Sequence, residues 1–206
     1  MGKLLLKLAL PNIAAQIVTF LYTLVDRIYN GQMDNGVQAM AAIGLCVPVV
    51  SLVTAIAALF GRGRTPLACI AMGRDDHPEA EKILSVSFFY LAVISLILSG
   101  LVLLFLDPLL VLLGAGGESL VYAESYLGIY AAGIVFAAFS VGLNFFINTQ
   151  GFTTFGLMTN IFGAGLNIVL DSIFIFGLNM GGLGATLAIV ISQLVSCIWV
   201  LPFFAS

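Results

Sequence analysis

The 206-residue chain is 61% hydrophobic and only 8% charged, with a formal net charge of −3 and a mean hydropathy of +1.16. A soluble domain carries about 25% charged residues, so this chain lacks the polar side chains needed to cover a soluble particle. The composition therefore indicates an integral membrane protein. We expect no nucleic-acid partner.

Charge-free apolar segments recur along the chain, and each of the first three is long enough for one membrane span of about 20 residues. A longer apolar stretch follows residue 124, and turn-forming sequences interrupt it at 148–154 and 177–182. These segments are too long for spanning strands and do not alternate, which excludes a barrel. We therefore predict an all-α membrane protein in which residues 1–206 form a single bundle of six transmembrane helices, over residues 8–31, 37–60, 82–106, 122–147, 154–177 and 182–204.

The basic residues predict the orientation of the bundle. Six of the seven lie before the first predicted helix or between the second and third: Lys3, Lys7, Arg62, Arg64, Arg74 and Lys82. With six spans these two segments share a side, which the positive-inside rule assigns to the cytoplasm. We expect a multi-pass protein of the plasma (inner) membrane with both termini in the cytoplasm.

The segment 61–82 is the one polar region of any length, and we expect it to be a cytoplasmic loop. Its sequence Asp76-His77-Pro78-Glu79 has the form of a capping box at the start of the third helix. The single histidine, His77, therefore has a structural interpretation. We expect no enzyme, because the spans contain no Ser–Lys or His–Glu constellation.

Three ionisable residues fall inside predicted spans, namely Asp26, Arg27 and Asp171. At 1.5 Å per residue, Asp26 lies about 27 Å along the first helix and Asp171 about 26 Å along the fifth. Both helices run from the inside outward, so the two acids are expected at a similar depth. Asn167 precedes Asp171 by four residues, which places both on one helical face.

A charged side chain inside a membrane is costly unless it faces a cavity or a partner, so these acids predict a functional site. A carboxylate removed from water can exchange a proton near neutral pH. Together with the Asn167 carboxamide, it can also offer oxygen ligands to a cation. The alternative for Asp26 is a structural pairing with Arg27, with both side chains snorkelling to the outer surface.

Five segments, taken in order, carry a resemblance to a known family: Leu8–Pro11, Val25–Ile28, Asn144–Gly151, Leu166–Phe176 and Gly181–Gln193. Together they resemble the multidrug and toxic compound extrusion (MATE) transporters along essentially the whole chain. The resemblance implies an antiporter that exports cationic drugs or toxic organic compounds in exchange for protons or sodium ions, with no other cofactor. It matches the first of the family's two six-helix lobes.

The resemblance also implies roles for individual residues. It places Asp26, Asn167 and Asp171 in the ion-binding cavity of the first lobe, as possible sodium ligands, with Asn144 as a further contributor. Pro11 matches a helix-1 proline at which bending has been linked to protonation. The sequence by itself indicates less, because Pro11 reads as a proline tolerated in the first turn of a helix and Asn144 lies near the inner end of its helix.

The chain departs from the family pattern in three respects. Ile189 stands where the family often has a threonine that would supply a hydroxyl ligand for sodium, although Thr186 is nearby. Arg62 and Arg64 stand where the family usually has small residues, and their role is left open. The second lobe is not encoded in this sequence. We therefore expect a second six-helix lobe as partner, from the same gene, from a neighbouring gene or as a parallel homodimer.

Two alternatives to the exporter lobe stay open. The first is a non-transporting fragment or membrane scaffold. A second six-helix sequence nearby would favour the exporter lobe over this first alternative. The other alternative is a lipid-precursor flippase of the related superfamily. Its cavity would need several bases to meet phosphates, whereas only Arg27 is available inside the spans.

Overall fold

The computed structural model describes residues 2–33 and 36–205, and this part of the chain is almost entirely helical. Six of its helices are long and apolar enough to cross a membrane, which confirms the predicted fold class. The elements are α1 (Gly2–Gly31), α2 (Gly36–Gly73), α3 (His77–Leu104), the short α4 (Leu106–Leu112), α5 (Glu118–Thr149), α6 (Thr153–Asp171), the π-helix η1 (Ser172–Gly177) and α7 (Gly181–Ala205).

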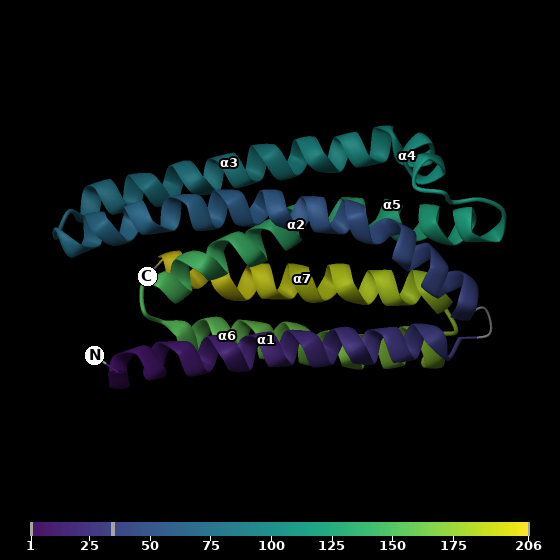
Figure 1. Ribbon diagram of the computed structural model, residues 1–206, viewed down its shortest axis with the longest axis horizontal. Coiled ribbons are helices and arrows are strands. Elements are labelled where there is room, and N and C mark those ends of the chain that lie inside the picture. Colours follow the sequence, from purple (N-terminus) through teal and green to yellow (C-terminus); the bar gives the residue numbers. More distant parts are fainter. Residues whose placement is uncertain (1, 34–35, 206) are drawn as a thin grey trace.

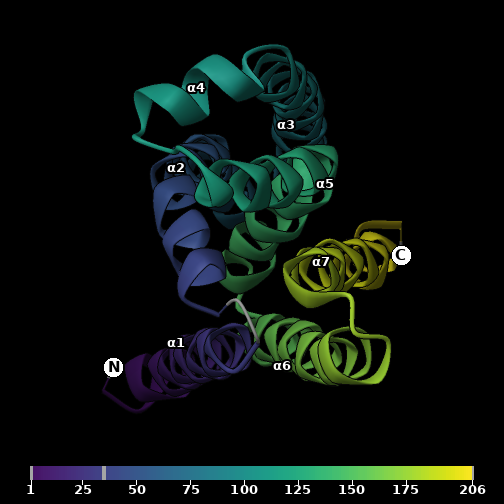
Figure 2. The same cartoon turned by 90° about the vertical axis from the view of Figure 1, so that its right-hand side faces the viewer.

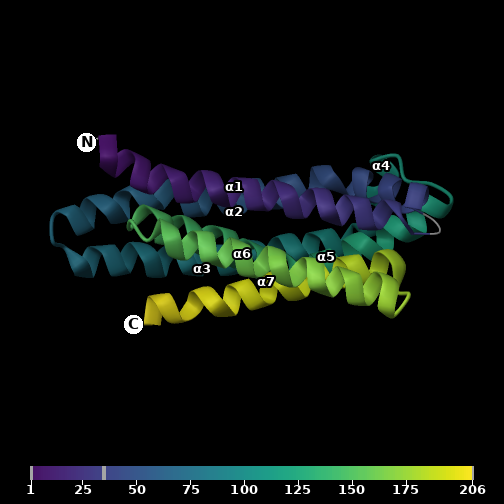
Figure 3. The same ribbon diagram turned by 90° about the horizontal axis from the view of Figure 1, so that it is seen from below.

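The long helices run side by side, and the two termini lie at the same end of the bundle (Figure 1). The α2–α3 hairpin extends beyond both termini at that end, as the view from below also shows (Figure 3). An end-on view separates α1 and α6 from the group formed by α2, α3 and α5, with α7 beside both (Figure 2). This arrangement leaves α1 packed mainly against α6.

Helix α5 lies at the centre of the bundle, where it packs against α2, α3 and α7. Two apolar clusters surround it, one including Cys46, Leu110, Leu127 and Ile134 and the other including Leu91, Leu143, Ile147 and Val200. Small residues allow the close approach: a Cβ atom at Gly142 would lie 2.6 Å from Leu91 Cδ1. Tight helix packing through small residues is the usual means of association in a membrane, where lipid is as apolar as the core.

The predicted loop over 61–82 is wrong in its extent. Helix α2 continues to Gly73 and α3 begins at His77, so that only residues 74–76 connect them. The predicted cap is confirmed, because the Asp76 side chain accepts a hydrogen bond of 3.2 Å from the backbone N–H of Glu79.

Arg62 and Arg64 consequently lie on α2 rather than in a loop. Their guanidinium groups stack over aromatic rings of neighbouring helices, at 4.4 Å from the Phe145 ring centroid for Arg62 and 5.0 Å from that of Tyr90 for Arg64. Cation–π contacts of this kind stabilise arginine on an apolar helix. The alternating glycines and arginines of 61–64 are typical of a loop. In the structure they belong to α2, and the two arginines pack against rings of α5 and α3.

Helix α1 begins at Gly2, six residues before the predicted start at residue 8. Pro11 therefore lies in the helix interior, and its expected position in the first turn is wrong. A proline there removes one backbone hydrogen bond and crowds the preceding turn, so it is a point at which a helix bends easily.

Candidate ion site and adjoining polar cavity

Asp171 is the last residue of α6 and is fully buried. Neither of its carboxylate oxygens has a hydrogen-bond partner among the described residues. Asn167, one turn earlier, is 3% exposed, and both polar atoms of its side chain also lack a partner there. Buried polar groups are almost always paired in folded proteins, so four unpaired atoms in one turn make this the candidate binding site of the bundle.

Asp26 lies on α1, which packs against α6. Its Oδ1 atom accepts a hydrogen bond of 3.2 Å from the Asn30 side-chain amide, which also donates to the Asp26 backbone carbonyl at 2.8 Å. Within the described chain no ion pair joins Asp26 to Arg27, whose side chain is exposed. The hydrogen-bond donor to the Asp26 carboxylate among the described residues is therefore the Asn30 amide.

The C-terminal end of α1 contacts η1, the continuation of α6, next to the two acids. Ser172, which follows Asp171, has its hydroxyl 3.4 Å from the Tyr29 hydroxyl, and the Tyr29 ring packs edge-on against Phe176 with 5.3 Å between centroids. Asp26 and Asp171 thus lie on packed helices close to this contact. Two acids on adjacent helices repel each other unless a proton or a cation lies with them.

Asn30 was missed by the sequence reasoning. It is 0% exposed, and its Oδ1 atom is buried without a hydrogen-bond partner in the described part of the chain. The spacing of four residues between Asp26 and Asn30 repeats that between Asn167 and Asp171, and this repetition was an available signal. With Asn30 included, two carboxylates and two carboxamides supply the oxygen ligands that hard cations prefer.

Asn144 lies elsewhere in the bundle. Its side-chain amide donates to the Gly156 carbonyl at 3.3 Å, and its Oδ1 accepts from Asn148 at 2.6 Å. Gly156 lies in the first turn of α6, 15 positions before Asp171, or about 22 Å at 1.5 Å per residue. The structure therefore brings Asp26, Asn167 and Asp171 into one region and keeps Asn144 at the other end of α6, where it ties α5 to α6.

The α6 backbone changes form at the acid. Residues Ser172–Gly177 continue the helix as a π-helix, which ends before the turn at Leu178. π-helical turns inside α-helices occur frequently at functional sites. A Cβ atom at Gly184 of α7 would lie 2.8 Å from Phe174 Cβ, so η1 also packs tightly on α7.

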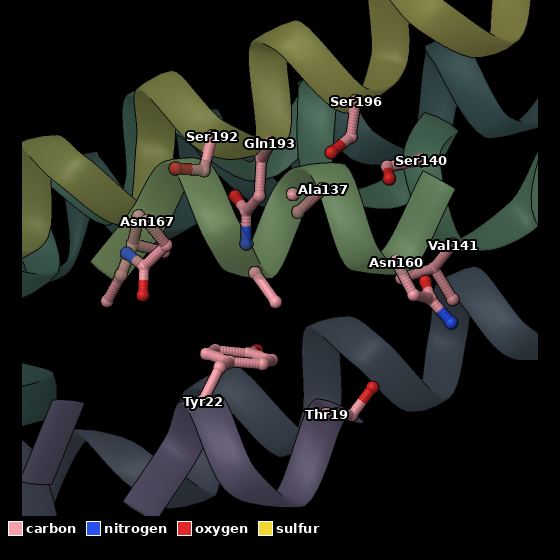
Figure 4. A pocket seen from close by; sticks show the side chains of 13 residues that line it. Thr19, Tyr22, Ala137, Ser140, Val141, Asn160, Asn167, Ser192, Gln193 and Ser196 are labelled. Carbon is pink, nitrogen blue, oxygen red and sulfur yellow. The ribbon is translucent and has the colours of Figure 1, made fainter. Parts of the chain in front are cut away.

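A cavity of about 190 Å³ adjoins Asn167 on the side toward the chain termini, between α1, α5, α6 and α7 (Figure 4). Its lining contains eight uncharged polar residues and no charged residue. The polar ones are Thr19, Tyr22, Ser140, Asn160, Asn167, Ser192, Gln193 and Ser196. Ile189 also lines it, whereas the nearby Thr186 hydroxyl donates to the Gly182 carbonyl at 2.9 Å and is thus engaged within its own helix.

Six helices long and apolar enough to cross a membrane surround buried polar groups without partners among the described residues, which is the construction of a multi-pass membrane protein. A protein-family model described as MatE matches residues 11–173. The chain belongs to the MatE family, as the sequence resemblance implied.

Curated relatives include a multidrug export protein named MepA from Staphylococcus haemolyticus (strain JCSC1435), which is 27% identical over 203 residues. MepA of Staphylococcus aureus (strain MSSA476) is 25% identical over 202 residues. In both comparisons the match covers 98% of this chain and 45% of the relative. The chain therefore spans about half the length of the curated relatives it matches.

Solved structures of the same family also match this chain over about half of their own length. A MATE protein in the bent conformation superposes with a TM-score of 0.90 at 28% identity, over 98% of this chain and 45% of that one. An outward-facing multidrug resistance transporter of the MATE family and MOP superfamily superposes with a TM-score of 0.92 at 28% identity, over 98% and 44% of the two chains. The described bundle thus has the fold of about half of such a transporter.

Proposed function

We propose that this chain is one six-helix lobe of an ion-coupled antiporter that exports cationic drugs or other toxic organic compounds. The coupling ion, a proton or sodium, binds between Asp26, Asn167 and Asp171, with Asn30 holding Asp26 in place. The proposal is supported above all by one observation: Asp171 is fully buried, and both its carboxylate oxygens lack a partner within the described residues.

Coupling follows from the cost of an unpaired buried charge. With the site empty, two carboxylates on adjacent helices repel each other and the unpaired oxygens are poorly solvated. A proton or sodium ion removes both penalties, so the occupied site favours tighter packing of α1 on α6. Pro11 within α1 and the π-helix after Asp171 offer the backbone weak points at which such a change is least costly.

Alternating access requires a second lobe opposite this one. We propose that a further six-helix bundle of the same orientation completes the transporter, as a continuation of the chain, a separate polypeptide or a second copy. The exposed face of α1 suits such a contact or a lipid contact, since it carries Leu10, Ile13, Ile17 and Phe20. The relatives named as multidrug exporters, about twice as long, support this part of the proposal.

The cargo proposed is cationic rather than phosphorylated. The cavity beside Asn167 is lined by no charged residue, and Arg27 is exposed on α1. A lipid precursor would bring phosphates that need several basic partners. The observed lining therefore favours the drug exporter over the flippase.

The proposal is tested by cation efflux. Cells producing the chain, alone or with its second lobe, are loaded with ethidium and given either a pH gradient or a sodium gradient. Asp171→Asn is expected to abolish efflux driven by either ion. The matched control is Asp107→Asn, the same chemical change at an exposed residue of α4. Undiminished efflux by the Asp171 variant would remove this residue from the mechanism, and no efflux by any form would favour the non-transporting scaffold.

A further inference from the structure

Arg64 on α2 is a charged residue that the proposed ion site does not use. Its guanidinium carbon lies 5.0 Å from the centroid of the Tyr90 ring in α3. Tyr90 in turn stacks on Phe60 of α2, with 6.0 Å between ring centroids and 21° between ring planes. Phe60 and Arg64 are four residues apart and therefore share one face of α2. Two aromatic rings on neighbouring helices thus support the guanidinium where α2 meets α3.

No carboxylate pairs with Arg64 in the part of the chain that the structure describes. The ion pairs found there join His77 to Asp75 and Lys82 to Glu79. An arginine stacked on an aromatic ring still presents the N–H groups in its own plane, and this planar fork matches the oxygens of a phosphate. The guanidinium of Arg64 is therefore arranged to receive an anion.

The position of Arg64 along α2 indicates where in the membrane this anion lies. At the outer end of α2, the Gln38 side-chain amide donates to Glu118 at 3.4 Å, a polar contact that belongs outside the hydrocarbon. Arg64 follows Gln38 by 26 residues, or about 39 Å at 1.5 Å per residue. A bilayer is about 30 Å thick in its hydrocarbon core and about 40–45 Å thick with its headgroups. Arg64 therefore lies at the headgroup level of the cytoplasmic leaflet.

Beyond this level the α2–α3 hairpin leaves the membrane. Helix α2 continues for nine residues to Gly73, about 14 Å further, and the hairpin extends past both chain termini (Figures 1 and 3). The cytoplasmic leaflet carries anionic lipids, which give it a negative surface potential. The anion that the membrane supplies at the level of Arg64 is therefore a lipid phosphate.

An apolar face leads from Tyr90 into the membrane. Ile97 and Leu101 follow Tyr90 by seven and eleven residues, so all three side chains lie on one side of α3. They are exposed to 41%, 53% and 46% for Tyr90, Ile97 and Leu101 respectively. A phospholipid with its phosphate at Arg64 would lay its acyl chains along this face, whereas a free phosphate ion would gain nothing from it.

We propose that Arg64, supported by Tyr90 and Phe60, binds the phosphate of an anionic phospholipid in the cytoplasmic leaflet. The bound lipid fixes the level at which the α2–α3 hairpin leaves the membrane. Arg62 is not part of this site, because it points to another side of α2 and stacks on Phe145 of α5. The candidate ion site lies between α1 and α6, so the inference does not depend on the proposed transport.

The test is native mass spectrometry of the purified full chain, which counts the lipids bound to the intact protein. Phosphatidylglycerol and phosphatidylcholine with identical palmitoyl and oleoyl chains are titrated separately. Both probes contain a phosphate, but choline adds a positive charge that offsets it and glycerol does not. The first molecule of phosphatidylglycerol is expected to bind about tenfold more tightly than the first molecule of phosphatidylcholine, as one charge-assisted bidentate contact would give.

Three variants address the site. Arg64→Gln is expected to reduce the tenfold preference to about twofold, since other bases near the membrane surface still attract the anionic lipid. Arg64→Lys keeps the charge without the planar fork and should give an intermediate preference. Tyr90→Leu keeps an apolar side chain but removes the stacking, and it should lower the preference about threefold.

The matched control is Arg74→Gln, the same change of charge at an exposed position ten residues further along the chain. That separation is about 15 Å at 1.5 Å per residue and exceeds the Debye length of about 8 Å at physiological ionic strength. The control should therefore retain the tenfold preference.

Four results would overturn the inference. The first is equal binding of the two lipids by the unmodified chain. The second is an unchanged preference in both Arg64→Lys and Tyr90→Leu, which decide the matter if Arg64→Gln does not fold. The third is an equal loss in Arg64→Gln and Arg74→Gln, which would show a general effect of net charge. The fourth is displacement of phosphatidylglycerol by inorganic phosphate, which would show that the site takes the free ion.

Discussion

The Ser172 hydroxyl lies 3.4 Å from the hydroxyl of Tyr29, and this contact joins the first residue after Asp171 to the third residue after Asp26. The two chain segments that follow the acids are thus in direct contact. Under the proposed mechanism, we therefore expect a change in ion occupancy of the acids to affect the π-helix on one side and the end of α1 on the other.

Replacing Tyr29 tests this contact. Tyr29→Phe removes the hydroxyl but keeps the ring against Phe176, so we expect a loss of stability of about 1 kcal/mol or less. Tyr29→Ala also removes the edge-on ring contact and is expected to cost about 2–3 kcal/mol more. Thermal unfolding of the purified chain in detergent measures both. Equal stability of the two variants would show that the ring does not hold η1 to α1.

Asn30 is expected to position Asp26. Asn30→Ala removes the amide that donates to both the Asp26 carboxylate and the Asp26 carbonyl, so the affinity for the coupling ion should fall by about tenfold. The matched control is Thr23→Ala, which removes a side-chain hydrogen bond of 2.8 Å to the carbonyl of Thr19 on the same helix. An equal loss of affinity in both variants would indicate general disruption of α1.

The close contact between α5 and α6 predicts the effect of replacing Gly156. A Cβ atom at Gly156 would collide with the Asn148 side-chain oxygen and lie 2.9 Å from that of Asn144. Gly156→Ala is therefore expected to destabilise the chain by about 1–3 kcal/mol. Gly165→Ala, on the same helix with open space around its Cβ position, should be neutral or slightly stabilising. Unfolding temperatures of the two variants that do not differ would contradict the role assigned to Asn144 and Asn148.

The position of Pro11 inside α1 predicts where this helix is flexible. Pro11→Ala restores a backbone hydrogen bond in the interior of α1, so amide exchange in the surrounding turns should slow. If α1 bends there during the ion-dependent change, the difference in exchange between ion-bound and ion-free forms should also become smaller. An unaltered difference would place the movement elsewhere, at the π-helix for example.

The sequence predicts the fold well because the membrane imposes a simple rule. Long charge-free segments need to be helices, and six of them are found in the described chain. The ends are less predictable: Arg62 and Arg64 read as loop residues because of the glycines beside them, yet aromatic rings on α5 and α3 keep them within α2.

Part of the candidate site could be predicted from the sequence, again because of the membrane. Asp26 and Asp171 are conspicuous because a charge in an apolar helix is costly. Asn30 was overlooked because an amide near the end of a span has no such cost, and its burial depends on how α1 meets its neighbours. The cavity could not be predicted, since serine and glutamine side chains of membrane helices can also bond to neighbouring helices, and only packing decides which of them face one another.

The most direct measurement is ion binding by the purified chain, which needs neither the second lobe nor a cargo. Unfolding temperature is recorded as sodium replaces choline at constant ionic strength and, separately, as the pH is lowered. We predict that at least one ion raises the unfolding temperature, that Asp171→Asn abolishes the rise, and that Asp107→Asn retains it. A rise of the same size in the Asp171→Asn variant would contradict the account.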